Sequence, residues 1–363
     1  MLHLIAAAVL AQLPVTWQVS PAEAHDVELS GDGTQVLYAH GFLDSGGWVT
    51  GLYLHDRAAG TTTELARSPV PPAQHESSLV HGGLSADGRY VAYAMGLSYT
   101  GSGGGPVYVH QTVLVDTTTG LTEIVSVDPS GAPISRSSRP LDVSADGRFV
   151  LFTTYADDVL PGDDLLSLDL FRRDRLLGVT ELVSVTVDGQ PISDDDIHSA
   201  SISDDGDVVA FSSDAYNLVQ PFPSKHQVFV RTMSTGVTVV ASETAAGVHG
   251  SGHSSQERLS PDGRYLVFRS WASNLDPADT NGQADIFWKD LATGALERVS
   301  VSSTGAQTSD LSNLPDVSAG GRFVVFDSYS AGLVPTDQNG LVDVFLRDRW
   351  AGLTRRVSLA DDA

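Results

Sequence analysis

Cysteine is absent from this sequence, and positive charge is scarce. Without cysteine the chain can form no disulfide, no thiolate metal site and no cysteine nucleophile. Lys and Arg number 21 against 45 Asp and Glu, which gives a formal net charge of −24. Such a surface repels phosphate backbones and anionic lipid headgroups. Binding to nucleic acid or to an anionic membrane is therefore excluded as a starting hypothesis.

Long apolar runs are also scarce, and the clearest one lies at the N-terminus. Residues 2–13 are mostly apolar, but this stretch is shorter than the roughly 20 residues that span a bilayer. Its length is that of a signal-peptide core, and Ala22-Glu23-Ala24 provides a small-x-small cleavage site. We predict a signal peptide over residues 1–24, no membrane span, and a secreted or periplasmic protein. The alternative is an N-terminal strand that packs on the body of the protein.

A repeat occupies the remainder of the chain. The pattern Ser-x-Asp-Gly followed by an apolar run, with Gly in place of Asp in the last copy, begins at six serines: Ser30, Ser85, Ser144, Ser203, Ser260 and Ser318. The intervals are 55, 59, 59, 57 and 58 residues. Each copy continues with a segment such as LFRRDRLLG (170–178) and then one such as VTELVSV (179–185). Six copies at this period indicate a repeat architecture.

Each copy is interpreted as four short strands. Asp-Gly forms the first hairpin turn, and the Ser adds a local hydrogen bond to it. The sixth copy has Gly320 in place of the aspartate, so its turn should lack the carboxylate cap. Six such units predict an all-β fold, a six-bladed β-propeller with four antiparallel strands per blade. The blades are expected over residues 25–67, 76–127, 137–187, 197–243, 254–302 and 311–360, within one domain of residues 25–363. An open solenoid is the competing architecture, but it would need capping repeats, which are not apparent.

This combination resembles a known family. The Ser-x-Asp-Gly-Arg pattern followed by Phe-x-x-Asp is similar to the TolB-type, WD40-like (PD40) propeller repeat, over about residues 25–360. The resemblance implies a six-bladed TolB-like β-propeller. TolB has a further α/β domain, and related peptidases have an α/β-hydrolase domain, and we expect neither in this chain. Gly-x-Ser-x-Gly, which a hydrolase of that type requires, is missing as well.

Two acidic loops are candidate calcium sites. Both have the sequence Asp-x-Asn-Gly-x-x-Asp, and calcium prefers six to eight oxygen ligands arranged around a turn. The candidate ligands are Asp279, Asn281 and Asp285 in blade five, and Asp337, Asn339 and Asp343 in blade six. The alternative is structural: Asn-Gly makes the turn and the aspartates cap backbone N–H groups.

Histidines form a second candidate site. Four of them, His75, His198, His249 and His253, lie just before or within the first strand of blades two, four and five. First strands line the central channel of a propeller, so these side chains are expected at the channel mouth. There they are candidate ligands of a transition metal. Solvated mouth residues without a ligand are the alternative.

Arginines recur in two sets. Arg89, Arg148, Arg264 and Arg322 follow the first hairpin, and Arg57, Arg175 and Arg349 follow the aspartate of the third strand. We expect them to form ion pairs between blades with the recurring aspartates. Exposed pairs of this kind contribute about 0–1 kcal/mol each.

These features predict an exported, non-catalytic binding platform for another protein or a cell-envelope polymer. The acidic surface favours a basic or calcium-bridged partner. The alternative is a metal-dependent propeller enzyme, of glycan lyase or hydrolase type, with its site at the histidine-bearing channel mouth.

Overall fold

The structure is a computed structural model that describes residues 24–44, 47–67, 81–100, 106–161, 167–192, 197–221, 223–335, 337 and 340–358. The predicted signal peptide up to residue 23, His75 and Asn339 lie outside these residues. Regular structure in the described part is almost entirely β-strand, with one short 3₁₀ turn, η2 (Ala319–Gly321). No helix there has the length and apolar character that crossing a membrane requires.

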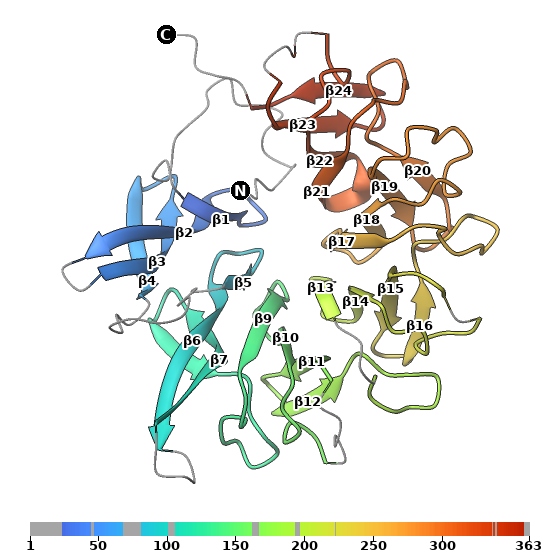
Figure 1. The fold of residues 1–363 in the computed structure, drawn as a ribbon. Coiled ribbons are helices and arrows are strands. Elements are labelled where there is room, and N and C mark those ends of the chain that lie inside the picture. The colour runs from blue at the N-terminus through green and yellow to red at the C-terminus, as the bar shows by residue number, and fades with distance from the viewer. Residues whose placement is uncertain are drawn as a thin grey trace. The chain divides into compact units, whose positions relative to one another are not determined.

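The strands form six antiparallel sheets of four strands, and strands that follow each other in the chain pair within each sheet (Figure 1). These sheets are the blades of a six-bladed β-propeller, which confirms the fold predicted from the repeat. The first three blades are β1 (Ala24–Leu29), β2 (Gln35–Asp44), β3 (Gly47–Asp56), β4 (Thr61–Arg67); β5 (His81–Leu84), β6 (Tyr90–Thr100), β7 (Pro106–Asp116), β8 (Leu121–Ile124); and β9 (Ser138–Val143), β10 (Phe149–Thr154), β11 (Asp169–Asp174), β12 (Val179–Leu182). The last three are β13 (Ile197–Ile202), β14 (Val208–Ser213), β15 (Gln227–Thr232), β16 (Val237–Val240); β17 (Ser254–Leu259), β18 (Tyr265–Ser270), β19 (Asp285–Asp290), β20 (Leu296–Arg298); and β21 (Ser312–Val317), β22 (Phe323–Ser328), β23 (Asp343–Asp348), β24 (Leu353–Arg356).

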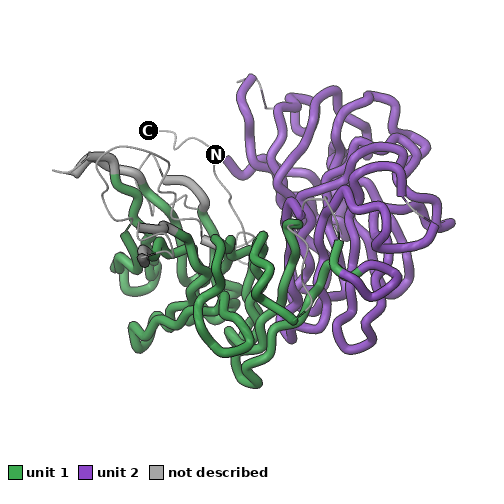
Figure 2. The backbone as a smooth tube through the Cα atoms, turned by 60° about the horizontal axis from the view of Figure 1, so that its bottom comes forward, with its two compact units in different colours: residues 1–4, 17–185, 191–194 green, residues 5–16, 186–190, 195–363 purple. Residues whose placement is uncertain are grey.

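The blades fall into two compact units (Figure 2). One unit contains strands β1–β12 and the other contains β13–β24. In the second unit the first strands of neighbouring blades pack against one another, β13 on β17 and β17 on β21.

The first hairpin of each blade is stabilised by its serine, as the sequence predicts. In blade three the Ser144 hydroxyl donates to Asp146 at 2.9 Å and accepts the Phe149 backbone N–H at 2.9 Å. The first five blades share this arrangement. In blade six Ser318 still accepts the N–H five residues on, but Gly320 replaces the aspartate and adopts a φ of 74°. Glycine takes this φ without steric cost, so the turn forms without its carboxylate.

A second serine ties the outer strand of a blade to its third strand. In blade three the Ser184 hydroxyl donates to Asp169 at 2.7 Å and accepts the Leu170 N–H at 3.0 Å. Blades two, four, five and six repeat both bonds, with Gln111 or Gln227 as the acceptor in blades two and four. The serine of the recurring Val-Ser-Val segment is therefore a structural residue.

Facing phenylalanines fill the core of blades three to six. One ring comes from the second strand and one from the third, and all eight are buried. The stacked pairs, with centroid distances of 5.6 to 6.0 Å, are Phe152–Phe171, Phe211–Phe229, Phe268–Phe287 and Phe326–Phe345. Full burial of such a ring stabilises the fold by about 1.5–3 kcal/mol.

The arginine prediction was wrong for one set of residues. Arg89, Arg148, Arg264 and Arg322 pair with the third-strand aspartate of their own blade, at 2.6 to 3.0 Å. The antiparallel register of the second and third strands places these partners directly beside each other. In the second set, Arg175 pairs with Glu123 and Arg349 with Glu297 of the preceding blade, so the partner is a glutamate of the fourth strand and not an aspartate. Arg57 donates instead to the Gly33 carbonyl of its own blade.

Candidate functional site

Blade four brings three potential ligands to one end of its sheet. His198 is the second residue of β13, Asp214 directly follows β14, and His226 directly precedes β15. Ser213 pairs with Ile197 on one side and with Gln227 on the other. Because antiparallel strands meet start to end, this register places the three side chains together.

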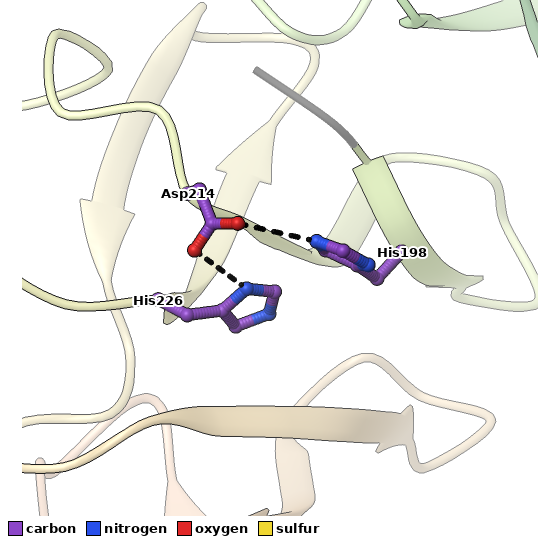
Figure 3. A group of neighbouring side chains, drawn as sticks. All are labelled: His198, Asp214 and His226. Carbon is purple, nitrogen blue, oxygen red and sulfur yellow. Dashed lines mark hydrogen bonds and ion pairs between the residues drawn. The ribbon is translucent and has the colours of Figure 1, made fainter.

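The carboxylate of Asp214 lies between the two imidazoles (Figure 3). One oxygen is 3.1 Å from Nδ1 of His226 and the other is 3.4 Å from Nε2 of His198. The imidazole rings are 4.5 Å apart between centroids and tilted by 54°. One nitrogen or oxygen atom of each residue lies within 4.8 Å of the others. Within the described part of the chain, this is the one group of three such residues close enough to hold a metal ion.

The three side chains differ in burial. His226 is 8% exposed, whereas the side chains of His198 and Asp214 are 46% and 51% exposed. Burial lowers the pKa of His226; the charge of Asp214 opposes this shift, and His198 and His253 add to it. The His226 ring is therefore neutral at neutral pH, with an unprotonated nitrogen.

The start of blade five adjoins this group. The Ser254 N–H donates to the carbonyl of His226 at 3.0 Å, and the His253 ring lies 6.3 Å from the His226 ring. The Trp271 N–H donates to the carbonyl of His253 at 2.9 Å. Gly252 permits this close approach, because a Cβ there would lie 2.5 Å from the Trp271 backbone. We call His198, Asp214, His226, His253 and Trp271 the histidine edge.

Only part of the predicted histidine set is found at this edge. His198 and His253 are there, but His249 lies in the connection between β16 and β17, where its carbonyl accepts a hydrogen bond from Asn274. Asp214 and His226 were not predicted as site residues from the sequence. A comparison of strand ends across the six repeats could have found them. Asp214 directly follows the second strand of blade four and His226 directly precedes its third strand, in the same blade as His198.

An arginine side chain occupies the acidic cluster of blade five. Arg298, on β20, lies 3.0 Å from Asp276, 3.6 Å from Asp279 and 3.2 Å from Asp285. Burial raises the pKa of Asp285, against the effect of Ser300 and of the Arg298 charge. The Asn281 amide donates to the Thr308 carbonyl and its oxygen accepts the N–H two residues on, as in the turn alternative.

Blade six repeats this arrangement. Arg356 lies 3.3 Å from Asp337 and 3.2 Å from Asp343, and Ser358 donates to Asp343. In both loops a guanidinium therefore supplies positive charge to the carboxylates. Calcium binding at these loops stays a prediction.

Comparison with known proteins bears on the fold. No protein-family model matches the chain, and no curated protein matches it. Among solved structures it is similar to the β-propeller domain of the Trilobed protease from Pyrococcus furiosus, at 12% identity and a TM-score of 0.56, over 94% of this chain and 86% of that one. An oligogalacturonate lyase in complex with manganese is 15% identical, with a TM-score of 0.50, over 92% and 76% of the two chains. A putative TolB from Agrobacterium tumefaciens is 17% identical, with a TM-score of 0.46, over 84% and 87%. At these identities the similarity to the first two structures shows the propeller fold alone, and membership of the PD40 repeat family stays a prediction.

Proposed function

We propose that this propeller is an exported, non-catalytic platform that binds another protein through the ends of its second strands. The observation that supports this proposal is an exposed aromatic side chain that recurs at one position. The residue directly after the second strand is Tyr155 in blade three, Trp271 in blade five and Tyr329 in blade six, and these are 43%, 40% and 49% exposed. Export rests on the signal peptide predicted over residues 1–24.

Aromatic rings at these positions are suited to contact rather than to folding. The cores of blades three, five and six are already filled by their phenylalanine pairs, so an exposed ring one residue beyond the strand adds little to them. Tyrosine and tryptophan are enriched at protein interfaces, where a rigid ring buries a large area at low entropic cost. Tyr155 also lines a hollow of about 350 Å³ with Val109 and residues 135–137. A ring held at such a hollow is a natural contact point for a partner.

Charge narrows the class of partner. With a net charge of −24, the chain attracts a basic protein and repels an acidic one. The Arg269 guanidinium lies over the Trp271 ring at 5.1 Å, which holds the indole in place from the side of β18. We expect association to weaken as salt is added, because the Debye length falls to about 8 Å at physiological ionic strength.

Affinity capture from the envelope fraction and culture fluid of the source organism tests this proposal. The wild type should retain a defined protein, and the double variant W271S/Y329S should lose it. A matched control removes exposed apolar side chains at another place, in the turn after β11: L176S/L177S should retain the partner. Capture that survives protease treatment of the extract would indicate a polymer instead. Equal capture by both double variants would contradict the proposal.

A second candidate is the metal-dependent enzyme acting on a glycan. The convergence of His198, Asp214 and His226 favours it, since metal-assisted reactions on sugars need such ligands next to solvent. The test is turnover of acidic and neutral polysaccharides by protein loaded with zinc, manganese or cobalt. Absence of turnover with every metal, in protein that demonstrably holds the ion, would eliminate this candidate.

A further inference from the structure

We propose that His198, Asp214 and His226 bind one divalent transition-metal ion of the zinc type on blade four. This inference does not depend on which ligand the platform binds, because it concerns the ion alone. It also differs from the metal site expected from the sequence, which used His75, His198, His249 and His253, and it shares only His198 with that set.

The spacing of the ligand atoms fits a metal ion. Zinc lies about 2.1 Å from imidazole nitrogens and carboxylate oxygens, so ligand atoms around a tetrahedral ion are about 3.4 Å apart. One oxygen of Asp214 lies 3.1 Å from Nδ1 of His226 and the other lies 3.4 Å from Nε2 of His198, and one ligand atom of each residue lies within 4.8 Å of the others. Small side-chain rotations, rather than backbone movement, would bring all three atoms to one ion.

Among the described residues, Asp214 is the only hydrogen-bond partner of the His226 ring nitrogens. Nδ1 contacts Asp214, and Nε2 is buried without a hydrogen-bond partner in the described part of the chain. A buried polar atom without a partner costs roughly 1–3 kcal/mol. This ring is thus held by its packing next to β15 and by Asp214 rather than by a hydrogen-bond network of its own. An ion at the Asp214 side would add a strong interaction to a ring that is already positioned.

The other blades provide an internal comparison. The residues at the three corresponding positions are Arg139, Tyr155 and Leu168 in blade three, Ser255, Trp271 and Ala284 in blade five, and Asn313, Tyr329 and Val342 in blade six. None of these sets can hold a metal ion, yet the same fold forms in each blade. The ligand types of blade four are therefore not required to build a blade. Coordination of one metal ion would explain why blade four has a ligand residue at all three positions.

The site also has room for an outer ligand. Three protein ligands leave at least one coordination position, as in catalytic rather than structural zinc sites. His198 and Asp214 are about half exposed, so this position is open to solvent. Water or an oxygen ligand such as a carboxylate can occupy it.

The ligand set also predicts which ions bind. Imidazole nitrogen suits zinc, cobalt, nickel and copper, whereas calcium and magnesium require oxygen ligands. With two imidazoles and one carboxylate, we expect zinc and cobalt to bind well and calcium and magnesium to bind poorly. This distinguishes the site from the acidic loops of blades five and six.

Isothermal titration of the metal-free full chain with zinc chloride tests the proposal. The wild type should bind one ion per chain, and H198A and D214N should each bind about tenfold or more weakly. Both altered side chains are exposed, so both variants should fold, and their melting temperatures verify this. H249A is the matched control, a histidine outside the group, and should bind as the wild type does. With cobalt in place of zinc, a visible absorption band should appear in the wild type and H249A and be lost in H198A and D214N.

Three results would overturn the proposal. The first is a wild type that binds no zinc. The second is zinc binding by H198A and D214N that equals that of the wild type. The third is loss of the ion in H253A but not in D214N, which would place the ion on the Nε2 side of His226.

Discussion

Arg298 is the residue whose replacement should destabilise the protein most clearly. Its side chain is only 4% exposed and lies 3.0 to 3.6 Å from three carboxylates. Two of these, of Asp279 and Asp285, are almost fully buried themselves. Arg298→Met keeps the aliphatic length and removes the charge, so the two buried carboxylates lose their counter-charge. Removal of one partner of a buried pair costs about 3–5 kcal/mol, and we expect a loss of free energy of unfolding in this range at pH 7.

The pH dependence of this loss gives a second quantity to measure. Burial already raises the pKa of Asp285 in the folded state, and removal of Arg298 raises it further. A carboxyl whose folded-state pKa exceeds its unfolded value of about 3.9 destabilises the fold above that folded-state pKa. As the pH falls through it, the folded protein binds the proton and recovers stability. The difference between R298M and the wild type should therefore shrink from pH 7 towards pH about 4.

Urea unfolding followed by tryptophan fluorescence measures both quantities. The matched control is R355M, which removes an exposed arginine of β24 and should change stability by less than about 0.5 kcal/mol. A loss below about 1 kcal/mol in R298M, or one that does not change with pH, would refute the reasoning.

The same variant tests the calcium prediction for this loop. Without the guanidinium, Asp276, Asp279 and Asp285 form a cluster of oxygen ligands of the kind calcium prefers. Added calcium should then raise the unfolding midpoint of R298M more than that of the wild type. A wild-type midpoint that falls with EDTA and returns with calcium would show that the wild type binds calcium, and loss of this effect in D279A would assign the ion to this loop.

Three further substitutions have definite expected outcomes. Burial raises the pKa of Glu257, so wild-type stability should fall as the pH rises from about 4.3 through the folded-state pKa. In thermal melts, E257Q should therefore be more stable than the wild type at pH 8 and equally stable near pH 4. The Arg322 guanidinium holds the pKa of Asp348 at about 2, and R322A should return it towards about 3.9 in an NMR titration; an unchanged value would contradict the ion pair. Gly252→Ala places a Cβ 2.5 Å from the Trp271 backbone, so it should lower the free energy of unfolding by about 1–3 kcal/mol and shift the tryptophan emission. An unaltered melting temperature and emission spectrum would mean that Gly252 and Trp271 are not in close contact.

The fold could be predicted because its information is local and repeated. Ser144, Asp146 and Gly147 form a hairpin turn from contacts within a few residues, and six copies of that turn set the blade count. The candidate site lacks such a local pattern. Asp214 and His226 are 12 residues apart in the sequence, and only the register of β14 with its two neighbours places both next to His198.

The contacts of the acidic loops could not be predicted from the loop sequences, for a similar reason. The aspartates of Asp-x-Asn-Gly-x-x-Asp were visible, but the cation beside them comes from the fourth strand. Arg298 follows Asp285 by 13 residues, and it lies beside that carboxylate because Arg298 pairs with Phe287 across β19 and β20. A pattern confined to one loop shows the ligand oxygens without the charge that neutralises them.

Substitution of Asp214 distinguishes a role in metal binding from a role in stability, because the residues that other blades have at this position suggest a replacement that the fold accepts. The corresponding residue is a tyrosine or a tryptophan in blades three, five and six. The Asp214 carboxylate is half exposed and contacts only imidazoles among the described residues. An exposed pair of this kind contributes about 0–1 kcal/mol. We therefore expect Asp214→Tyr to change the free energy of unfolding by less than about 1 kcal/mol, since the blade tolerates that side chain at this point, and to abolish zinc binding. Urea unfolding and zinc titration of one preparation measure both. A large loss of stability with zinc binding intact would mean that the carboxylate orders the two histidine rings as part of the fold, and that blade four diverged from its neighbours for structural reasons.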